Sequence, residues 1–169
     1  MKKIISSIAM LATIATASSI SQVGAAYSKG TDESKNITLF TTYNFAVGVG
    51  LRLEYSRNVS DYTEFLNADV SRYGLFATYT LPLGSSFSVT PKAGLVKTDG
   101  EFEMLSTLKK VSDSSTNFTY GLEVNYDVNE NVSLFTGYTD YGHKFKNVKS
   151  ITKSKIDSKN YTFGVKINL

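Results

Sequence analysis

Apolar and polar residues alternate with a period of two along most of the chain. In the last segment the odd positions are apolar, while polar residues or glycine stand between them, and the apolar set is Tyr161, Phe163, Val165, Ile167 and Leu169. Successive side chains of a strand point to opposite faces, so this alternation predicts a β-strand with one apolar face. Beyond the N-terminal leader, no stretch shows a competing helical period.

The same alternation recurs upstream and predicts a chain made of strands. Seven strands are clear, at residues 36–45, 47–57, 70–81, 87–98, 116–127, 132–142 and 159–169. An eighth and shorter strand is expected near residues 25–31, where a pairing partner is needed. The clear strands have about ten residues each, which is the length of a tilted transmembrane strand. The strand at 132–142 is the least regular, because Phe135 and Tyr141 fall on its polar side.

The links between the strands alternate in length. The short links are Ala46 and residues 82–86 and 129–131, and the long polar links are residues 58–69, 99–115 and 143–159. Short turns on one rim and long loops on the other are typical of bacterial outer-membrane barrels. The pattern therefore predicts an all-β fold: an eight-stranded antiparallel up-and-down transmembrane β-barrel with short periplasmic turns and long extracellular loops.

Alternation alone does not say which face points inward, and a soluble lipocalin-like barrel would bury the apolar face. Two features favour the membrane alternative. The apolar face carries tyrosine and phenylalanine near the strand ends, as an interfacial aromatic girdle does. The polar face is rich in small residues that suit a crowded interior, namely Gly48, Gly50, Gly74, Gly94, Gly121, Gly137 and Gly164. We therefore expect the polar face to line the inside of the barrel.

The N-terminal segment has the layout of a secretory signal peptide. Lys2 and Lys3 precede a moderately apolar stretch that reaches about Ala17, and small residues follow. We expect cleavage after Ala25, with cleavage after Ala17 as the alternative. Removing the first 25 of the 169 residues leaves residues 26–169, 144 in all, as one barrel domain. The formal charge then falls from +3 to +1, so no basic bias suggests a nucleic-acid partner.

The C-terminal strand resembles the outer-membrane β-signal, in which a polar residue, a glycine and two hydrophobic residues stand at fixed spacing. Thr162, Gly164, Ile167 and Leu169 fit that register, although the family usually ends in phenylalanine. The resemblance implies recognition by the barrel assembly machinery. Because an unpaired strand edge is very costly in lipid, the last strand is expected to close against the first.

The resemblance extends over the mature chain. Residues 71–99 and 118–142 are similar to the strand, turn, strand units of the outer-membrane β-barrel family that includes OmpA-like, OmpX-like and Ail-like eight-stranded proteins. That family includes adhesins, complement-evasion proteins, envelope stabilisers and proteins called porins. The resemblance implies location in the outer membrane of a Gram-negative envelope, in contact with its lipid and lipopolysaccharide.

Charged residues on the polar face are the first candidate site. An eight-stranded barrel has an interior only wide enough for side chains. An isolated charge there would be very costly, so we expect a mutually paired network that plugs the lumen, with a gated ion path as the alternative. Its members are Arg52, Glu54, Arg72, Lys92, Glu123 and Lys166.

An enzymatic site has little support in the sequence. Small outer-membrane barrels can act as lipid A deacylases or acyltransferases, and such enzymes use a histidine with a serine and an acid. His143 is the only histidine, and Lys144, Phe145 and Lys146 follow it where a deacylase would need a serine. No His, Asp and Glu cluster has metal-ligand spacing. We therefore expect no catalytic residue, no metal and no cofactor.

The last long loop is strongly basic. Its lysines are Lys144, Lys146, Lys149, Lys153, Lys155 and Lys159, and Asp157 is the one acid among them. A solvated loop is one interpretation, and salt-sensitive contact with lipopolysaccharide phosphates or anionic host or surface glycans is the other. Together these features predict a monomeric, non-enzymatic protein that presents loops for surface binding or adhesion, or that stabilises the envelope. A small passive porin-like channel is the first alternative, and a lipid A-modifying enzyme is the second.

Overall fold

The structure is a computed structural model that describes residues 20–31, 34–59, 65–104, 110–142 and 159–169. This part of the chain consists of strands and turns, and it contains no helix long and apolar enough to cross a membrane. The strands are β1 (Gln22–Gly30), β2 (Lys35–Ala46), β3 (Val49–Asn58), β4 (Phe65–Tyr79), β5 (Leu81–Pro82), β6 (Phe87–Met104), β7 (Lys110–Asp127), β8 (Val132–Asp140) and β9 (Lys159–Asn168).

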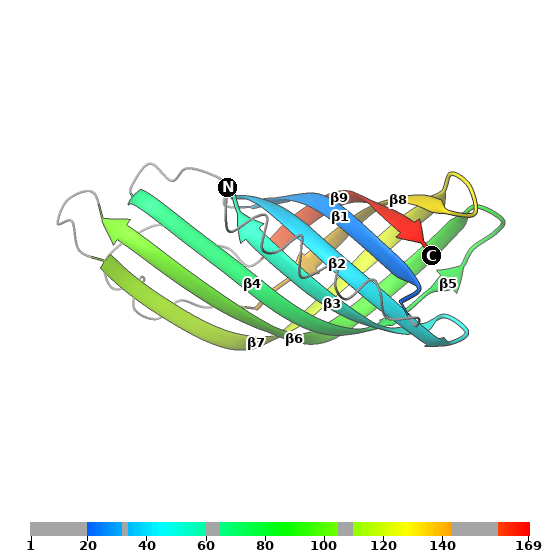
Figure 1. Cartoon of the computed structure of the whole chain (residues 1–169), viewed down its shortest axis with the longest axis horizontal. Coiled ribbons are helices and arrows are strands. Elements are labelled where there is room, and N and C mark those ends of the chain that lie inside the picture. Colours follow the sequence, from blue (N-terminus) through cyan, green and yellow to red (C-terminus); the bar gives the residue numbers. More distant parts are fainter. Residues whose placement is uncertain (1–19, 32–33, 60–64, 105–109, 143–158) are drawn as a thin grey trace.

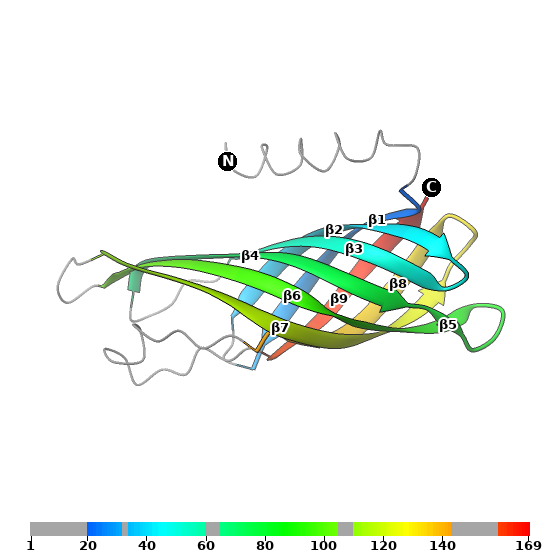
Figure 2. The ribbon, with the colours of Figure 1, turned by 90° about the horizontal axis from the view of Figure 1, so that it is seen from below.

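The strands form one closed antiparallel barrel (Figures 1 and 2). Each long strand pairs with its neighbours in the chain, β4 pairs with β6, and β1 pairs with β9. The short β5 continues from the end of β4 and pairs with the start of β6. The wall therefore has eight strands, and the predicted eight-stranded antiparallel barrel is confirmed.

Three tight connections lie at one end of the barrel. The β2–β3 turn is formed by Val47 and Gly48, and Gly48 has a φ of +74°, which residues with a side chain rarely adopt. Residues 83–86 and 128–131 make the other two turns at this end. The strands that flank the longer links end at the opposite rim, as the alternating link lengths predict.

The main difference from the sequence prediction is that β4, β6 and β7 are longer than expected. β4 begins at Phe65, β6 continues to Met104 and β7 begins at Lys110, so these strands enter the segments 58–69 and 99–115 that were predicted to be loops. The physical reason is that a strand beyond the membrane has water on both faces. Such a strand does not need an apolar face toward lipid, so the sustained alternation that marks a transmembrane strand in the sequence is not required there.

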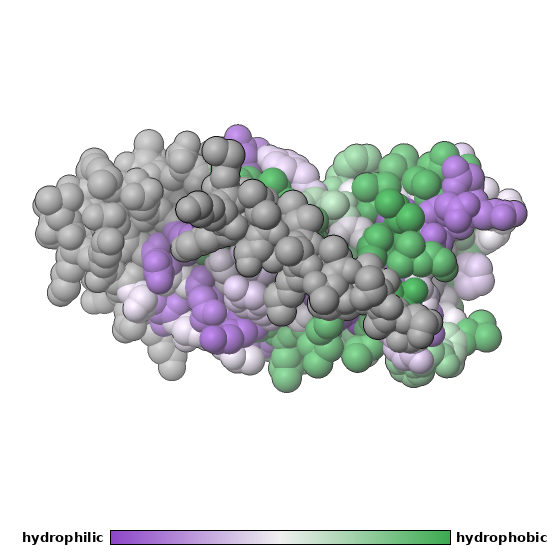
Figure 3. All heavy atoms as spheres, viewed as in Figure 1, coloured by the Kyte–Doolittle hydropathy of each residue, from purple (hydrophilic) through white to green (hydrophobic). Residues whose placement is uncertain are grey.

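Apolar side chains cover the outside of the barrel. Leu95, Phe118, Tyr161 and Phe163 are each about three-fifths exposed on the protein surface. Apolar residues gather over the half of the barrel that carries the short turns, at the right of Figure 3. The interior is instead lined mainly by polar and charged residues. This arrangement is the reverse of a lipocalin-like barrel, and it confirms the membrane orientation of the two faces.

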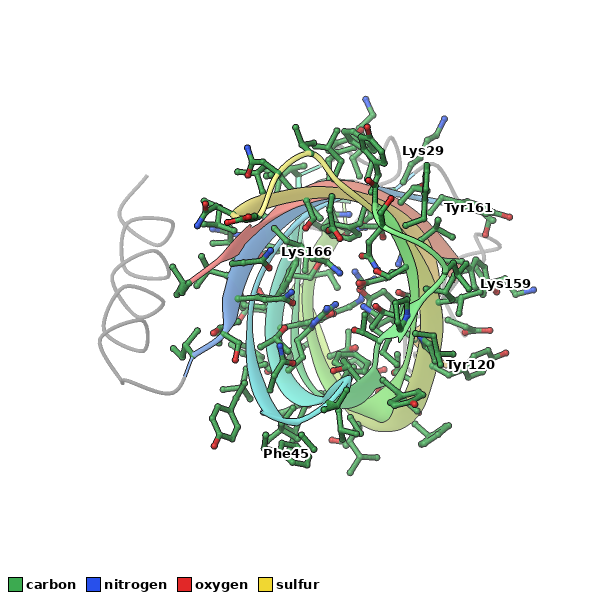
Figure 4. The ribbon with its side chains drawn as sticks, turned by 90° about the vertical axis from the view of Figure 1, so that its right-hand side faces the viewer. Lys29, Phe45, Tyr120, Lys159, Tyr161 and Lys166 are labelled. Carbon is green, nitrogen blue, oxygen red and sulfur yellow. The ribbon has the colours of Figure 1, made fainter. Side chains whose placement is uncertain are left out.

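Aromatic rings pair across neighbouring strands near both rims. Toward the rim of the longer links, the ring centroids of Tyr55 and Tyr73 lie 5.1 Å apart, and those of Tyr138 in β8 and Tyr161 in β9 lie 5.6 Å apart. Toward the other rim, Phe87 and Tyr126 lie 5.0 Å apart. Tyr161 projects away from the wall (Figure 4). Two such belts are typical of barrels whose apolar band is bounded by two membrane interfaces.

Candidate functional site: the filled lumen and the outer rim

Two carboxylates and three cations meet at the centre of the lumen. Glu123 in β7 accepts hydrogen bonds from Arg52 Nη1 at 2.5 Å and from Lys166 Nζ at 2.7 Å. Glu54 in β3 accepts one from Lys92 Nζ at 2.6 Å. Longer ion pairs of 3.5 Å and 3.6 Å join Arg52 to Glu54 and Lys92 to Glu123, so the five groups form one connected cluster. Each of the five residues is at most 7% exposed.

This lumen charge cluster contains five of the six residues that the sequence analysis placed in the interior. Arg72, the sixth, lies elsewhere in the lumen, where its Nη1 donates to Asn36 Oδ1 at 3.0 Å. The cluster links β3, β6, β7 and β9, of which only β6 and β7 are neighbours in the wall. Lys166 points inward from β9, whereas Lys159 at the start of that strand lies outside the wall (Figure 4).

Each buried cation also lies over an aromatic ring, a feature that the sequence analysis did not anticipate. Distances from the charged group to the ring centroid are 4.4 Å for Arg52 over Phe40, 4.8 Å for Lys92 over Phe76, 4.7 Å for Lys166 over Phe135 and 4.9 Å for Arg72 over Tyr141. A ring face attracts a cation, and the attraction grows when water is excluded. The rings therefore stabilise positive charge in a lumen where cations outnumber carboxylates among the described buried residues.

The rings occupy space that glycines in the wall leave open. A Cβ atom added to Gly24 would lie 2.1 Å from Cζ of Phe40, which is directly opposite in β2. A Cβ on Gly164 would lie 2.6 Å from the ring of Phe135, which is directly opposite in β8. Phe135 had appeared as an irregularity of its strand. An aromatic residue on the inward face, opposite a glycine, is the signal that could have identified these rings.

Polar contacts fill the lumen on both sides of the charge cluster. Toward the outer rim, Asn36 Nδ2 donates to Asn160 Oδ1 at 3.4 Å, and Thr38 donates to Ser56 at 3.0 Å. Toward the periplasmic rim, Asn125 accepts from Lys166 Nζ at 2.6 Å and donates to Ser88 and to Thr90. Side chains therefore occupy the interior on both sides of the cluster, in keeping with the narrow bore of an eight-stranded barrel.

The residues that resemble the assembly signal lie in β9 or directly after it. Thr162 and Gly164 are on the inward side, whereas Ile167 and Leu169 are exposed on the outside. β9 is paired on both sides, with β1 and with β8, and the backbone N–H of Leu169 donates to the carbonyl of Ser21 at 3.0 Å. The strand that carries these residues is thus the closing strand of the barrel.

Three lysines lie at the outer rim, and one of them, Lys159, belongs to the predicted basic loop. Lys29 and Lys35 lie directly opposite each other in β1 and β2, and both are exposed. Lys159 begins β9, the other neighbour of β1, and Figure 4 shows it with Lys29 outside the wall. Like charges opposite each other repel, so this pair favours a nearby anion. The remaining predicted loop lysines, Lys144, Lys146, Lys149, Lys153 and Lys155, lie outside the described residues.

The described residues contain no group of three or more His, Cys, Asp or Glu side chains that could hold a metal ion. His143, the residue on which the enzymatic alternative depends, lies outside the described residues.

Comparison with solved structures finds the same fold in several proteins, among them two outer-membrane surface proteins and an outer-membrane enzyme. Ail, the attachment invasion locus protein of Yersinia pestis, is 16% identical, with a TM-score of 0.53 over 89% of this chain and 95% of Ail. Neisserial surface protein A is 15% identical, with a TM-score of 0.56 over 89% of this chain and 95% of its own. The outer membrane enzyme PagL is 12% identical, with a TM-score of 0.52 over 88% of this chain and 98% of PagL. Ail has also been solved in complex with the heparin analogue sucrose octasulfate.

Identities this low show a shared fold and do not transfer an activity, particularly since one of the three proteins is an enzyme. A search of the curated proteins finds no match to this chain. The model of a protein family described as the outer membrane protein beta-barrel domain matches residues 7–168, almost the whole sequence. The chain therefore belongs to the outer membrane protein β-barrel domain family.

Proposed function

We propose that this protein is a non-enzymatic component of the outer membrane that presents a binding surface outside the cell. The observation that carries the proposal is a three-stranded sheet that extends beyond the rest of the barrel. The β3–β4 pairing stops at Arg57 and Ser71, whereas the β4–β6 pairing continues to Phe65 and Met104. This sheet, formed by the outer parts of β4, β6 and β7, is at the left of Figures 1 and 2.

Within the described part of the chain, the protruding sheet has no strand paired along either of its outer edges. The β7–β8 pairing begins at Tyr120, whereas the β6–β7 pairing continues outward to Lys110. Among the described residues, the segment of β7 from Lys110 to Phe118 therefore has a strand neighbour on one side only. An open edge presents backbone N–H and C=O groups, and an extended segment of another protein can pair with them. Such an edge outside the membrane suits a surface-binding function.

The filled lumen supports a binding role over transport. The charge cluster, its rings and the flanking polar contacts occupy the space that a small channel would need. An enzymatic role on lipid A would depend on His143. The residues that directly follow His143 do not include the serine that such chemistry uses. The proposed function therefore needs neither an open pore nor a catalytic group.

We expect removal of the protruding hairpin to reduce adhesion while the barrel still folds. The variant replaces residues 100–113 with an Asn-Gly turn between Asp99 and Ser114, which face each other and are joined by a 2.7 Å hydrogen bond. Gram-negative cells that express the full chain should bind cultured epithelial cells several-fold better than cells that express this variant. Heat-dependent gel mobility should be the same for both proteins. Equal adhesion would contradict the proposed role of the sheet.

The outer rim suggests the chemistry of a second contact. Lys29 and Lys35 lie at the same rim as Lys159, the last lysine of the predicted basic loop, and they have no ion pair with a described acid. They face the level at which lipopolysaccharide phosphates and anionic surface glycans would lie. The sulfated heparin analogue bound to Ail makes a sulfated glycan a reasonable probe for this chain.

We expect Lys29→Gln with Lys35→Gln to weaken binding to immobilised heparin, because the substitutions remove two positive charges from one surface. Lys97→Gln is the matched control, since Lys97 is exposed but already pairs with Asp99 at 3.3 Å. Binding of the unmodified protein should also fall steeply as salt rises toward about 1 M, where the screening length is about 3 Å. Salt-independent binding, or equal losses in the double variant and the control, would argue against an anionic ligand at this rim.

A further inference from the structure

We propose that the signal peptide is cleaved after Ala17, so that Ser18 is the first residue of the mature protein. The inference comes from the position of β1 in the barrel. β1 begins at Gln22, four residues before Ala26, which would be the first residue of the mature chain if cleavage followed Ala25. Cleavage after Ala25 would remove almost half of this strand.

The first half of β1 is paired on both sides. Gln22–Ala25 lie opposite Leu39–Thr42 of β2 and opposite Val165–Asn168 of β9. This segment therefore occupies the seam where the last strand closes the barrel. β2 and β9 do not pair with each other, so among the described strands β1 alone joins them.

Residues just before β1 are part of the same seam. The N–H of Ser21 donates to the carbonyl of Thr42 at 3.0 Å, and its carbonyl accepts from the N–H of Leu169 at 3.0 Å. The Ser21 hydroxyl accepts a further hydrogen bond from the N–H of Asn44 at 3.1 Å. Gln22 Nε2 donates to Asn168 Oδ1 at 2.9 Å. These contacts tie the chain from Ser21 onward to both neighbouring strands.

A cut after Ala25 would leave these partners facing lipid. The outward neighbours Leu39, Val165 and Ile167 belong to the apolar belt, so this part of the seam lies at membrane depth. Backbone N–H and C=O groups without partners are very costly in hydrocarbon, and for that reason membrane barrels are closed. The ring of Phe40 would also lose Gly24, against which it packs in the lumen.

The sequence around Ala17 fits the requirements of a cleavage site. Ala15, Thr16 and Ala17 match the A-x-A pattern of small residues, whereas Val23, Gly24 and Ala25 do not have alanine at the first position. The apolar segment Ile4–Ile14 has eleven residues, within the usual range of about 7–15 for the hydrophobic region of a signal peptide. A leader of 17 residues is also within the usual range of about 15–30.

The direct test is the N-terminal sequence and intact mass of the protein purified from outer membranes after expression of the full precursor. We expect the chain to begin at Ser18. Any other first residue would overturn the assigned site. A chain that begins at Ala26 and still shows heat-dependent gel mobility would also overturn the requirement for an intact β1.

Two matched variants test the site independently of the barrel. Ala17→Leu places a large residue at the proposed site and should cause uncleaved precursor to accumulate. Ala25→Leu should be processed normally, because Ala25 lies on the outward face of β1, where a leucine meets lipid. Accumulation of precursor in the Ala25→Leu variant, with normal processing of the Ala17→Leu variant, would refute the proposal. Neither variant alters the protruding sheet or the rim lysines, so this result is independent of the proposed binding function.

Discussion

Glu123→Ala is expected to lower the unfolding free energy of the barrel by about 3–5 kcal/mol, the usual effect of removing one partner from a buried ion pair. Glu123 accepts hydrogen bonds from Arg52 and Lys166 and lies 3.6 Å from Lys92, so its removal leaves several cations short of negative charge. The three cations are at most 7% exposed and cannot turn toward water. Urea titration of the protein refolded in detergent micelles measures the change.

Two further variants identify the cause of that loss. Glu123→Gln keeps the shape and a hydrogen-bonding group but removes the charge. Its unfolding free energy should therefore lie between those of the wild type and Glu123→Ala. Glu101→Ala removes an exposed carboxylate from the protruding sheet and should have little effect. If Glu123→Ala unfolds at the same urea concentration as Glu101→Ala, the charge cluster does not stabilise the barrel as described.

Phe40→Ala is expected to lower the unfolding free energy of the barrel by about 3–5 kcal/mol, as truncation of a well-packed buried phenylalanine usually does. Phe40 is 1% exposed and lies edge-on to Phe135, with ring centroids 5.6 Å apart. The guanidinium of Arg52 lies over its ring, 4.4 Å from the ring centroid. Its loss leaves a cavity and also removes one of the ring faces that stabilise a buried cation. The same urea titration applies, with Phe45→Ala on the outer surface as the control.

The opposing glycine provides a second and complementary test. Gly24→Ala should lower the unfolding free energy by about 1–3 kcal/mol, because the Cβ of the alanine would overlap the Phe40 ring and force the packing to shift. In a Phe40→Leu background the same substitution should cost less, since the smaller side chain leaves room. A double-mutant cycle measures this coupling. Strictly additive effects would mean that the ring and the glycine do not share one space.

The alternation of single strands predicts most of the wall, because a membrane barrel has lipid on one side and side chains on the other. Strands such as β3 and β9 are therefore evident from the sequence alone. The same reasoning fails for the outer parts of β4, β6 and β7, which extend beyond the rest of the wall and do not sustain the alternation of a transmembrane strand. It also places β1 too far along the chain, because Gly24 and Ala25 resemble the small residues near a signal cleavage site.

Inside the barrel, the sequence predicts which charges face inward but not which groups they contact. The opposition of Phe40 and Gly24 is a relation between two strands, and it depends on a register that neither strand shows alone. The same is true of Phe135 and Gly164, where the phenylalanine seemed to break the pattern of its own strand. Arg72 was grouped with the central charges because it shares their face, yet it contacts Asn36 and Tyr141 elsewhere in the lumen.

The apolar face of each strand meets hydrocarbon while the charged face is sealed inside, and one tryptophan on the outside of the barrel tests this arrangement directly. The chain contains no tryptophan, so Leu122→Trp introduces a single fluorescent reporter on the outward face of β7, between Pro91 of β6 and Tyr138 of β8. In bilayers whose acyl chains carry bromine, this fluorescence should be strongly quenched. Fluorescence equal to that in unbrominated bilayers would contradict this arrangement, because the outward face would then not be in contact with lipid.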